Sequence, residues 1–230
     1  MLISCWSTAG GAGTTVVSSC LALLLAARHA SGAVLADMSG DVPAVLGIPD
    51  VAPGPPDPSQ PGLAEWLAAG DDVPADALAR LEVPARSRLA FLPRGAGLLP
   101  TARAEALAAL LDHDPRPVVA DCGLRPIGAR AAVADAAPTS LLVTRLCYVS
   151  LRRALQATLQ PTGVVVVREP GRALTARDVE RTVKAPVVAH VEHDPGVSRA
   201  VDAGLLAARR MPRSIEAALR NLVKAGPHAS

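Results

Sequence analysis

The sequence contains very little lysine and very few aromatic residues. Two of its 230 residues are lysine, Lys184 and Lys224, and Phe, Trp and Tyr together make up 2%. A protein that stacks nucleic-acid bases on its surface needs exposed aromatic rings. The low aromatic content therefore argues against that class of protein. It also means that a core must be built from Ala, Val and Leu.

The cysteines show no pattern of a metal site or a disulfide framework. They are Cys5, Cys20, Cys122 and Cys147, each in an apolar stretch, and no two of them form a C-x-x-C pair. Zinc sites and disulfide-rich domains have closely spaced cysteines. We therefore expect reduced, buried thiols.

The sequence also has no apolar run long enough to cross a membrane. Val16–Ala27 is apolar, but it is shorter than the roughly 20 residues that a spanning helix needs. No Lys or Arg precedes Arg28, so the positively charged start of a secretion signal is missing. We expect a buried helix at this position and a cytoplasmic protein.

The net charge of +2 is unevenly distributed along the chain. Residues 1–115 carry a net charge of −6, and residues 116–230 carry +8. Such asymmetry indicates either a basic face for an acidic partner or a solvated surface in an arginine-rich sequence. We favour the second interpretation.

Short apolar runs alternate with stretches of helical periodicity. We expect strands at Leu2–Trp6, Ala33–Asp37, Arg88–Leu92, Pro117–Asp121, Ser140–Thr144, Gly163–Val167 and Pro186–His190. We expect helices at Thr14–His29, Thr101–His113, Ser150–Leu159, Ala176–Val183, Gly196–Ala208 and Ser214–Lys224. Continuous, β-branched strands are typical of sheets covered by helices on both faces. The alternation predicts an α/β fold with a doubly wound, mainly parallel sheet, in which ligands bind beyond the carboxyl ends of the strands.

A proline-rich stretch, Ala52–Gly62, interrupts this alternation and can continue neither a helix nor a central strand. Too little chain precedes it to form a domain, so we interpret it as a surface loop. We therefore expect one domain over residues 1–225, followed by a short tail at 226–230.

A glycine-rich loop directly follows the first predicted strand and precedes a long apolar helix. Its sequence is STAGGAGTT, residues 7–15. Glycines permit a tight turn, and successive backbone N–H groups can then surround a phosphate at a helix N-terminus. Because of its place between strand and helix, we interpret the segment as a phosphate-binding loop. Its candidate nucleotide-binding residues are Gly10, Gly11, Ala12, Gly13, Thr14 and Thr15.

The loop resembles the deviant phosphate-binding motif of the ParA/MinD family, K-G-G-x-G-K-[ST]-T. The glycines and Thr15 match this pattern. Ala9, however, stands at the position of the family's signature lysine, and Thr14 at the position of its phosphate-loop lysine. Neither Lys184 nor Lys224 lies near the loop in sequence, so both of the family's catalytic lysines are missing.

Two further segments resemble the acidic motifs of the family. Val34–Asp41 is similar to the motif at the second strand, whose leading aspartate, here Asp37, positions the attacking water. Val118–Gly123 is similar to the Walker B strand, with Asp121 facing the magnesium shell. An acid at the end of a strand can also simply cap the turn that follows. The paired positions of the two acids favour a site, and the resemblance implies that Thr15, Asp37 and Asp121 hold Mg²⁺.

The resemblance extends to the rest of the chain, from about Met1 to about Leu222. Gly62–Leu67 is similar to the family's G-L-x-x-x-L stretch, and Phe91–Gly95 to the strand that enters its dimer interface. Val191–Pro195 lies where family members pass the adenine, which implies base contacts from Glu192, His193 and Asp194. The most similar members are the MinD-like proteins of septum-site or Tad-pilus positioning. A P-loop NTPase fold of the SIMIBI class is implied.

The missing lysines imply a degenerate nucleotide site. A charge-assisted hydrogen bond to phosphate contributes about 1.5–3 kcal/mol, so losing one weakens binding by about tenfold to a hundredfold or more. We expect weakened binding of ATP or ADP with Mg²⁺, and a positioning or scaffold protein that hydrolyses ATP poorly or not at all. An active ATPase that uses arginine instead is the alternative. The candidates Arg94, Arg125 and Arg145 follow predicted strands.

The resemblance also implies protein partners. Family members form dimers with two nucleotides between their phosphate-loop faces, so we expect a homodimer or a heterodimer with a related protein, and a further protein partner. Non-specific DNA binding is an alternative, through Arg145, Arg152, Arg153, Arg209, Arg210 and Arg213. The amphipathic segment Ser214–Lys224 could be a membrane tail, but we favour a helix packed on the sheet.

Overall fold

The structure of the chain is a computed structural model, and it describes residues 1–48, 60–70, 73–74, 76–86, 88–208 and 211–224. Over these residues the strands form one eight-stranded sheet in the order β3-β4-β2-β5-β1-β6-β7-β8. The strands are β1 Leu2–Ser7, β2 Ala33–Asp37, β3 Val83–Arg86, β4 Leu89–Leu92, β5 Val118–Leu124, β6 Thr139–Arg145, β7 Gly163–Arg168 and β8 Val187–Glu192. All neighbouring pairs are parallel except β3 and β4, which are antiparallel.

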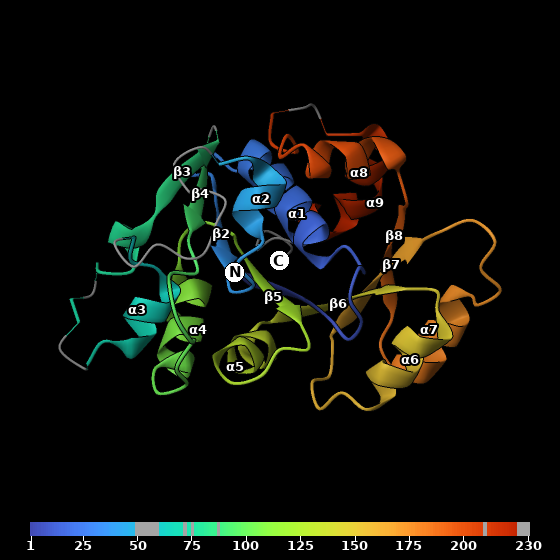
Figure 1. Cartoon of the computed structure of the whole chain (residues 1–230), viewed down its shortest axis with the longest axis horizontal. Helices are drawn as coiled ribbons and strands as arrows, with labels where there is room; N and C mark the ends of the chain where they lie inside the picture. Colours follow the sequence, from blue (N-terminus) through green and yellow to red (C-terminus); the bar gives the residue numbers. More distant parts are fainter. Residues whose placement is uncertain (49–59, 71–72, 75, 87, 209–210, 225–230) are drawn as a thin grey trace.

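Helices cover both faces of this sheet. The helices are α1 Thr14–Arg28, α2 Val42–Leu46, α3 Leu63–Ala68, α4 Ala104–His113, α5 Ala129–Ala136, α6 Tyr148–Leu155, α7 Ala176–Val183, α8 Pro195–Asp202 and α9 Arg213–Lys224. Figure 1 shows α1, α2, α8 and α9 on one face and α3 to α7 on the other. The predicted α/β fold with a doubly wound, mainly parallel sheet is confirmed.

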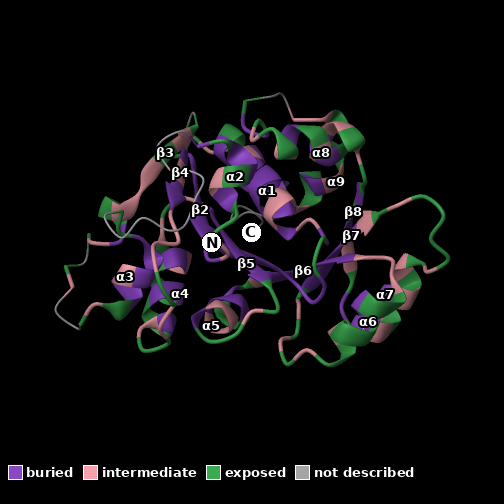
Figure 2. Ribbon diagram, in the orientation of Figure 1, coloured by how far each residue is buried: buried purple, intermediate pink, exposed green. Residues whose placement is uncertain are grey.

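Two hydrophobic clusters, one on each face, hold these layers together. The first contains residues of α1 such as Leu21 and Leu25, packed on strand residues such as Leu35 and Val165. The second is built around Trp6. Strand β1 is buried throughout, and β5 is buried up to its last residue, Leu124, as their colour in Figure 2 shows. A strand covered on both sides cannot alternate polar with apolar residues, which is why these strands read as continuous apolar runs.

Several helices and strands of the structure were not predicted from the sequence. Each is short, has weak apolar periodicity or contains a residue that disfavours its secondary structure. Strand β3 contains Pro84, which cannot donate to a sheet, and it lies at the sheet edge where this loss is tolerated. Helix α2 has only five residues. Helix α5 is rich in alanine and lacks a clear apolar stripe in sequence. Hydrophobic periodicity is weak in such segments.

The C-terminal helices also differ from the expected ranges. The helix expected at Gly196–Ala208 ends at Asp202, and Gly204 follows in a left-handed conformation with φ of 62°. Helix α9 packs on β8 and α1, and its apolar residues Ile215, Leu219 and Val223 are buried. This stripe is therefore part of the core, as expected for a helix packed on the sheet.

Three further expectations concern the cysteines, membrane-spanning helices, and the proline-rich stretch with the C-terminal tail. Cys5, Cys20 and Cys122 are free and buried as expected, but Cys147 is partly exposed because it lies just before α6 at the surface. None of the helices in the described parts of the chain has the length and apolar character needed to cross a membrane. Most of the proline-rich stretch, residues 52–59, and the expected tail at 226–230 lie outside the described residues.

Candidate functional site

The glycine-rich loop lies between β1 and α1, near the middle of the sheet and at the carboxyl end of its strands. Gly11 and Gly13 have φ values of 68° and 83°, in the left-handed region that favours glycine. Gly13 caps α1 without a side-chain hydrogen bond, and the first turn of α1 has no acidic residue. The free N–H groups at this helix end therefore have no carboxylate of their own helix beside them, which suits an anion.

Small, uncharged side chains stand where the family's lysines would be. Ala9 and Thr14 are 9% and 7% exposed, so both side chains are buried. Thr15 is half-buried, and its hydroxyl contacts the carboxylate of Asp121. The loop itself therefore offers backbone donors and hydroxyl groups, but no cation.

Two buried carboxylates lie on the β2 and β5 side of the loop. Asp37 and Asp121 are paired across β2 and β5 and are 1% and 0% exposed. The Ser39 hydroxyl lies 3.0 Å from Oδ1 of Asp37 and 2.9 Å from Oδ2 of Asp121. Backbone N–H groups of Gly40 and Gly123 also donate to the two carboxylates, at 2.6 Å and 3.2 Å.

Burial makes these two carboxylates hard to ionise together. Desolvation, followed by the charge of Asp121, raises the pKa of Asp37 to about 7. Desolvation also raises the pKa of Asp121, against the hydrogen bonds from Thr15 and Ser39. Because one Ser39 hydroxyl donates only one hydrogen, it cannot satisfy both carboxylates when both are charged. A proton or a cation between them would relieve this conflict.

These residues fit a hard divalent cation. Mg²⁺ prefers oxygen ligands and is usually held by one or two carboxylates together with substrate phosphates and water. Asp37, Asp121 and the Thr15 hydroxyl supply such oxygens next to the phosphate loop. Within the described ranges there is no group of three or more His, Cys, Asp and Glu side chains that could hold a metal ion alone. The site is thus suited to a metal that arrives with an anionic ligand.

A cavity of about 430 Å³ lies on the opposite side of the loop. Its lining includes the loop residues Gly11, Ala12 and Gly13, the side chains of Val16, Val17, Val167, Val191, Val197, Val201 and Ile215, and the polar residues Arg145, Glu169, Glu192, His193, Asp194, Ser198 and Asp202. An apolar cavity of several hundred Å³ with a few polar groups is typical of a small-molecule site. Three residues expected near an adenine, Glu192, His193 and Asp194, line this same cavity.

Arg145 lies at the boundary between this cavity and the loop. It ends β6, and its Nε donates to the backbone oxygen of Gly11 at 2.7 Å. Its Nη1 donates to Oε1 of Glu169 at 2.7 Å, and Arg172 pairs with the other carboxylate oxygen of Glu169. These two arginines lower the pKa of Glu169, Arg172 having the larger effect, so that the carboxylate stays ionised.

The other two candidate arginines lie elsewhere. Arg94 follows β4, and its Cδ would lie 3.2 Å from a Cβ on Gly40, beside the carboxylates. Arg125 is exposed beyond β5, and its backbone N–H donates to the Ser7 oxygen at 2.7 Å. Neither lines the cavity.

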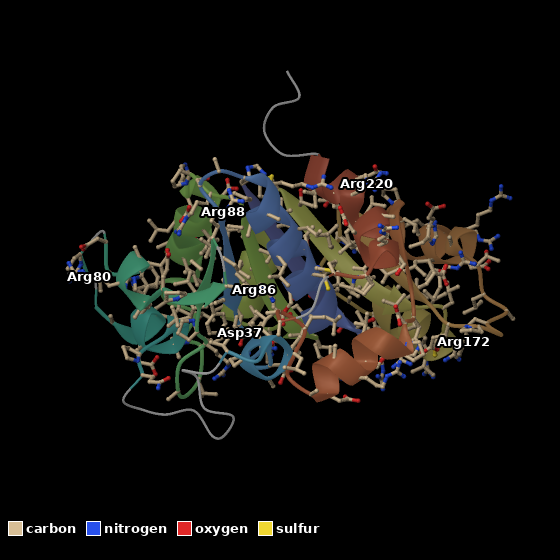
Figure 3. The ribbon with its side chains drawn as sticks, turned by 90° about the horizontal axis from the view of Figure 1, so that it is seen from above. Asp37, Arg80, Arg86, Arg88, Arg172 and Arg220 are labelled. Carbon is tan, nitrogen blue, oxygen red and sulfur yellow. The ribbon has the colours of Figure 1, made fainter. Side chains whose placement is uncertain are left out.

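Figure 3 labels Asp37 near the middle of the molecule and Arg172 toward one end, on opposite sides of α1.

Sequence reasoning missed three contributors to this arrangement. Ser39 was seen only as part of a motif, although its hydroxyl joins Asp37 and Asp121. Glu169 and Arg172 were not singled out. Glu169 accepts a hydrogen bond from Arg145, and Arg172 donates to the other carboxylate oxygen of Glu169. The one available signal was the position of Glu169 just after β7, at the ligand edge of the predicted sheet.

Large apolar side chains are exposed at the end of β5 and on the segments that follow β4, β5 and β6, at the same edge of the sheet as the loop. They are Leu98, Leu124, Ile127, Tyr148 and Val149, with exposed fractions between 39% and 88%. A side-chain carbon of Leu124 would lie 4.0 Å from a Cβ on Gly10, so this leucine lies beside the loop. Exposed apolar side chains of this size mark interaction sites where they form a contiguous patch.

Comparison with known proteins finds close similarity only at the level of structure. No model of a known protein family and no curated protein sequence matches the chain. A ParA family ATPase from Chlorobium tepidum TLS superposes with a TM-score of 0.78 at 16% identity over 97% of both chains. The septum-site-determining protein MinD from Pyrococcus horikoshii OT3, solved with Mg-ADP, gives 0.76 at 18% identity over 97% of this chain and 94% of that one.

A third solved structure, an ATP complex of McdA from Cyanothece, gives a TM-score of 0.67 at 18% identity over 96% of this chain and 95% of the other. These similarities cover nearly the whole length of each protein. At such low identity they establish the arrangement of strands and helices rather than a shared activity. This chain therefore has the fold of the ParA/MinD ATPases, with a phosphate-type loop at the position expected for that fold.

Proposed function

We propose that this protein is a ParA/MinD-like positioning or scaffold protein with a degenerate nucleotide site, which hydrolyses ATP poorly or not at all. The observation that carries the proposal is the loop between β1 and α1. It keeps the left-handed glycines of a phosphate cradle but has buried Ala9 and Thr14 in place of lysines. The fold, shared with a ParA family ATPase and a septum-site-determining protein, supports the positioning role.

In this proposal the cavity and the carboxylates hold different parts of one ligand. The loop residues 10–15 bind the phosphates through backbone N–H groups. Glu192, His193 and Asp194 face the base from the cavity wall. Thr15, Asp37 and Asp121 contribute oxygens to Mg²⁺, and Asp37 would position water if any hydrolysis occurs.

Weak hydrolysis follows from the absent loop cations. Cationic groups at the transferred phosphoryl act mainly in the transition state, and an arginine supplied there is worth about 10³–10⁵ in rate. Binding loses less than catalysis, because the backbone donors and Mg²⁺ remain. The proposal is thus a protein in which nucleotide is a structural ligand rather than a consumed substrate.

Titration calorimetry with ATP and ADP in the presence of Mg²⁺, followed by a phosphate-release assay, tests this proposal. We expect weak binding and a release rate equal to that of Asp37→Ala. A magnesium-dependent rate comparable to that of active ATPases, abolished by Asp37→Ala, would contradict it and favour the divergent ATPase. Absence of binding at millimolar nucleotide would leave only the scaffold role.

We also propose that the apolar surface of Leu98, Leu124, Ile127, Tyr148 and Val149 is a protein interface. Apolar side chains of this size, exposed beside the loop, favour association with a second copy or a related protein. Light scattering of Ile127→Glu should show a smaller species than the wild type. The matched control is Leu155→Glu, because Leu155 is similarly exposed but lies at the far end of α6. Equal masses for all three proteins would count against this interface.

Non-specific DNA binding remains the second candidate function. Its supporting observation is that Arg152 and Arg153 on α6 and Arg213 on α9 are exposed. Arg209 and Arg210 lie outside the described residues. Binding through phosphates must weaken steeply as salt increases. A gel shift that is absent, or insensitive to salt, would exclude this function.

The remaining parts of the proposal concern extent and place. We propose that residues 1–225 act as a single unit in the cytoplasm, with 226–230 as a tail. The two hydrophobic clusters support this, because both include residues from early and late segments of the chain. Limited proteolysis should give one resistant core rather than two fragments.

A further inference from the structure

We propose that Arg145 supplies the phosphate-binding cation that the loop lacks, and that Glu169 is the residue that positions it. This inference rests on the proposed nucleotide site, and it assigns to one side chain of β6 a task that the loop cannot perform. Arg145 stands apart from the other candidate arginines because its contacts place it at the loop and in the cavity together.

The path of the sheet explains why Arg145 reaches the loop. Strand β6 is hydrogen-bonded directly to β1, so their carboxyl ends lie side by side. The loop leaves the end of β1, and Arg145 is the last residue of β6. Its Nε then donates to the Gly11 oxygen at 2.7 Å. A side chain from a separate strand thus lies against the turn at which phosphate-loop glycines surround an anion.

The guanidinium retains donors that can serve an anion. Arginine carries five N–H donors in a planar fork. Nε is used by Gly11 and Nη1 by Glu169, whereas Nη2 makes no hydrogen bond to any part of the chain that the structure describes. This Nη2 lies 2.5 Å from where a Cβ of Gly11 would be. The absence of a side chain at Gly11 is therefore what lets the fork lie so close to the loop.

The charges of the cavity make this cation necessary. Its described lining includes four acidic residues, Glu169, Glu192, Asp194 and Asp202, and Arg145 is the one Arg or Lys among the lining residues. Without Arg145, phosphates bound at the loop side of this cavity would have no Arg or Lys side chain beside them among the described lining residues. Arginine is suited to the task because its fork matches phosphate geometry.

Glu169 and Arg172 hold the guanidinium in this position. Glu169 accepts from Arg145 on one carboxylate oxygen and from Arg172 on the other. The group of two arginines and one glutamate keeps a net positive charge. A long arginine side chain loses rotational freedom when it is fixed, and a partner that fixes it beforehand lowers this cost for the ligand.

Affinity measurements with a series of adenine ligands test the inference. Titration calorimetry should show that Arg145→Ala weakens ATP and ADP binding by about tenfold to a hundredfold, the loss of one charge-assisted contact. Adenosine, which has no phosphate, should bind the variant and the wild type equally. The control is Arg177→Ala, which removes the same charge from an exposed site on α7 and should leave all affinities unchanged.

Rescue by a lysine in the loop separates a phosphate contact from a structural role. If Arg145 provides the missing cation, Thr14→Lys in the Arg145→Ala background should restore most of the lost ATP affinity. If Arg145 only braces the loop through Gly11, the single variant should lose adenosine binding as well, and the added lysine should not help. That result would overturn the inference.

The remaining outcomes distinguish the inference from the proposal beneath it. A wild-type protein that binds ATP, with an Arg145→Ala variant that binds it equally well, would overturn the role of Arg145 and leave the nucleotide site intact. A wild-type protein that binds neither ATP nor ADP at millimolar concentration would overturn both. A circular dichroism melt of each variant checks that the fold is retained.

Discussion

The carboxylates on the two sides of the phosphate loop lie in opposite electrostatic environments. On the β2 and β5 side, Asp37 and Asp121 are fully buried, share the Ser39 hydroxyl and have raised pKa values. On the β6 and β7 side, Glu169 lies between two arginines, and its pKa is lowered. On the first side two carboxylates face each other, whereas on the second side Arg145 and Arg172 compensate the negative charge of Glu169.

The difference between the two sides shows which of them a bound cation would stabilise more. Buried carboxylates without a cation cost free energy, and a bound metal removes that cost. Glu169 is half-buried and already paired with two arginines, so a further cation would stabilise it little. The carboxylate side is therefore expected to respond strongly to pH and Mg²⁺, whereas the arginine side should respond to ligands that carry phosphate.

The largest expected effect is a loss of stability as pH rises. Because the pKa of Asp37 rises from 3.8 to about 7 on folding, the folded state holds a proton that the unfolded state has released. The unfolding free energy should therefore fall by about 2–3 kcal/mol between about pH 5 and about pH 8. In Asp37→Asn this decrease should be smaller by that amount. Urea denaturation at several pH values measures it, and equal slopes for the two proteins would contradict the burial argument.

The next effect concerns the glycine that lies between the two sides. Gly11→Val should destabilise the protein by about 1–2 kcal/mol, because Gly11 has φ of 68° and a left-handed conformation is costly for other residues. The valine would also displace the Arg145 guanidinium, so ATP binding should weaken. Gly10→Ala is the control, since the nearest atom to its new Cβ, on Leu124, would be 4.0 Å away. Equal melting temperatures for the two variants would contradict the cost that we assign to a left-handed conformation at position 11.

A smaller effect is expected from the hydroxyl that joins the carboxylates. Ser39→Ala removes the hydroxyl that lies between Asp37 and Asp121, with its one donated hydrogen, and should cost about 1 kcal/mol at neutral pH. Added Mg²⁺ with nucleotide should recover part of this loss, because the metal neutralises the same oxygens. Ser198→Ala, whose hydroxyl has only longer contacts of 3.4 Å and 3.5 Å, serves as the comparison in chemical denaturation.

The smallest effect is expected at the outer end of the arginine side. Arg172 pairs with Glu169 near the surface, where solvent and salt screen the interaction. Arg172→Ala should leave the melting temperature unchanged and reduce ATP affinity less than Arg145→Ala does. A loss as large as that of Arg145→Ala would mean that Arg172 itself contacts the ligand.

The elements predicted from sequence were those with strong periodicity. Ala176–Val183 was predicted with the observed bounds, and buried strands such as Gly163–Arg168 were found to within one or two residues, except β5, which ends three residues beyond its predicted end. The antiparallel edge strand β3 and the short helix α2 were missed, because they depend on contacts with neighbours more than on their own sequence. The strand order was likewise beyond the reach of local patterns.

The candidate site was predicted in its parts rather than in its arrangement. The loop was identified from its glycines between strand and helix, and Asp37 and Asp121 from the resemblance to the family's acidic motifs and from their paired positions at the ends of predicted strands. Arg145 was one of three arginines with the same sequence signal, and only its contact with Gly11 separates it from the others. Glu169 had no signal beyond its position after β7, because an ion pair depends on tertiary distance.

The sequence by itself determined that a phosphate-type loop without lysine joins an apolar strand to an apolar helix. Both features are local, since glycine spacing and side-chain type need no partner. Only the tertiary structure decided that β6 lies beside β1, that Arg145 therefore reaches the loop, and that two carboxylates share one hydroxyl. These contacts join residues far apart in the chain, and packing of the sheet is what brings them together.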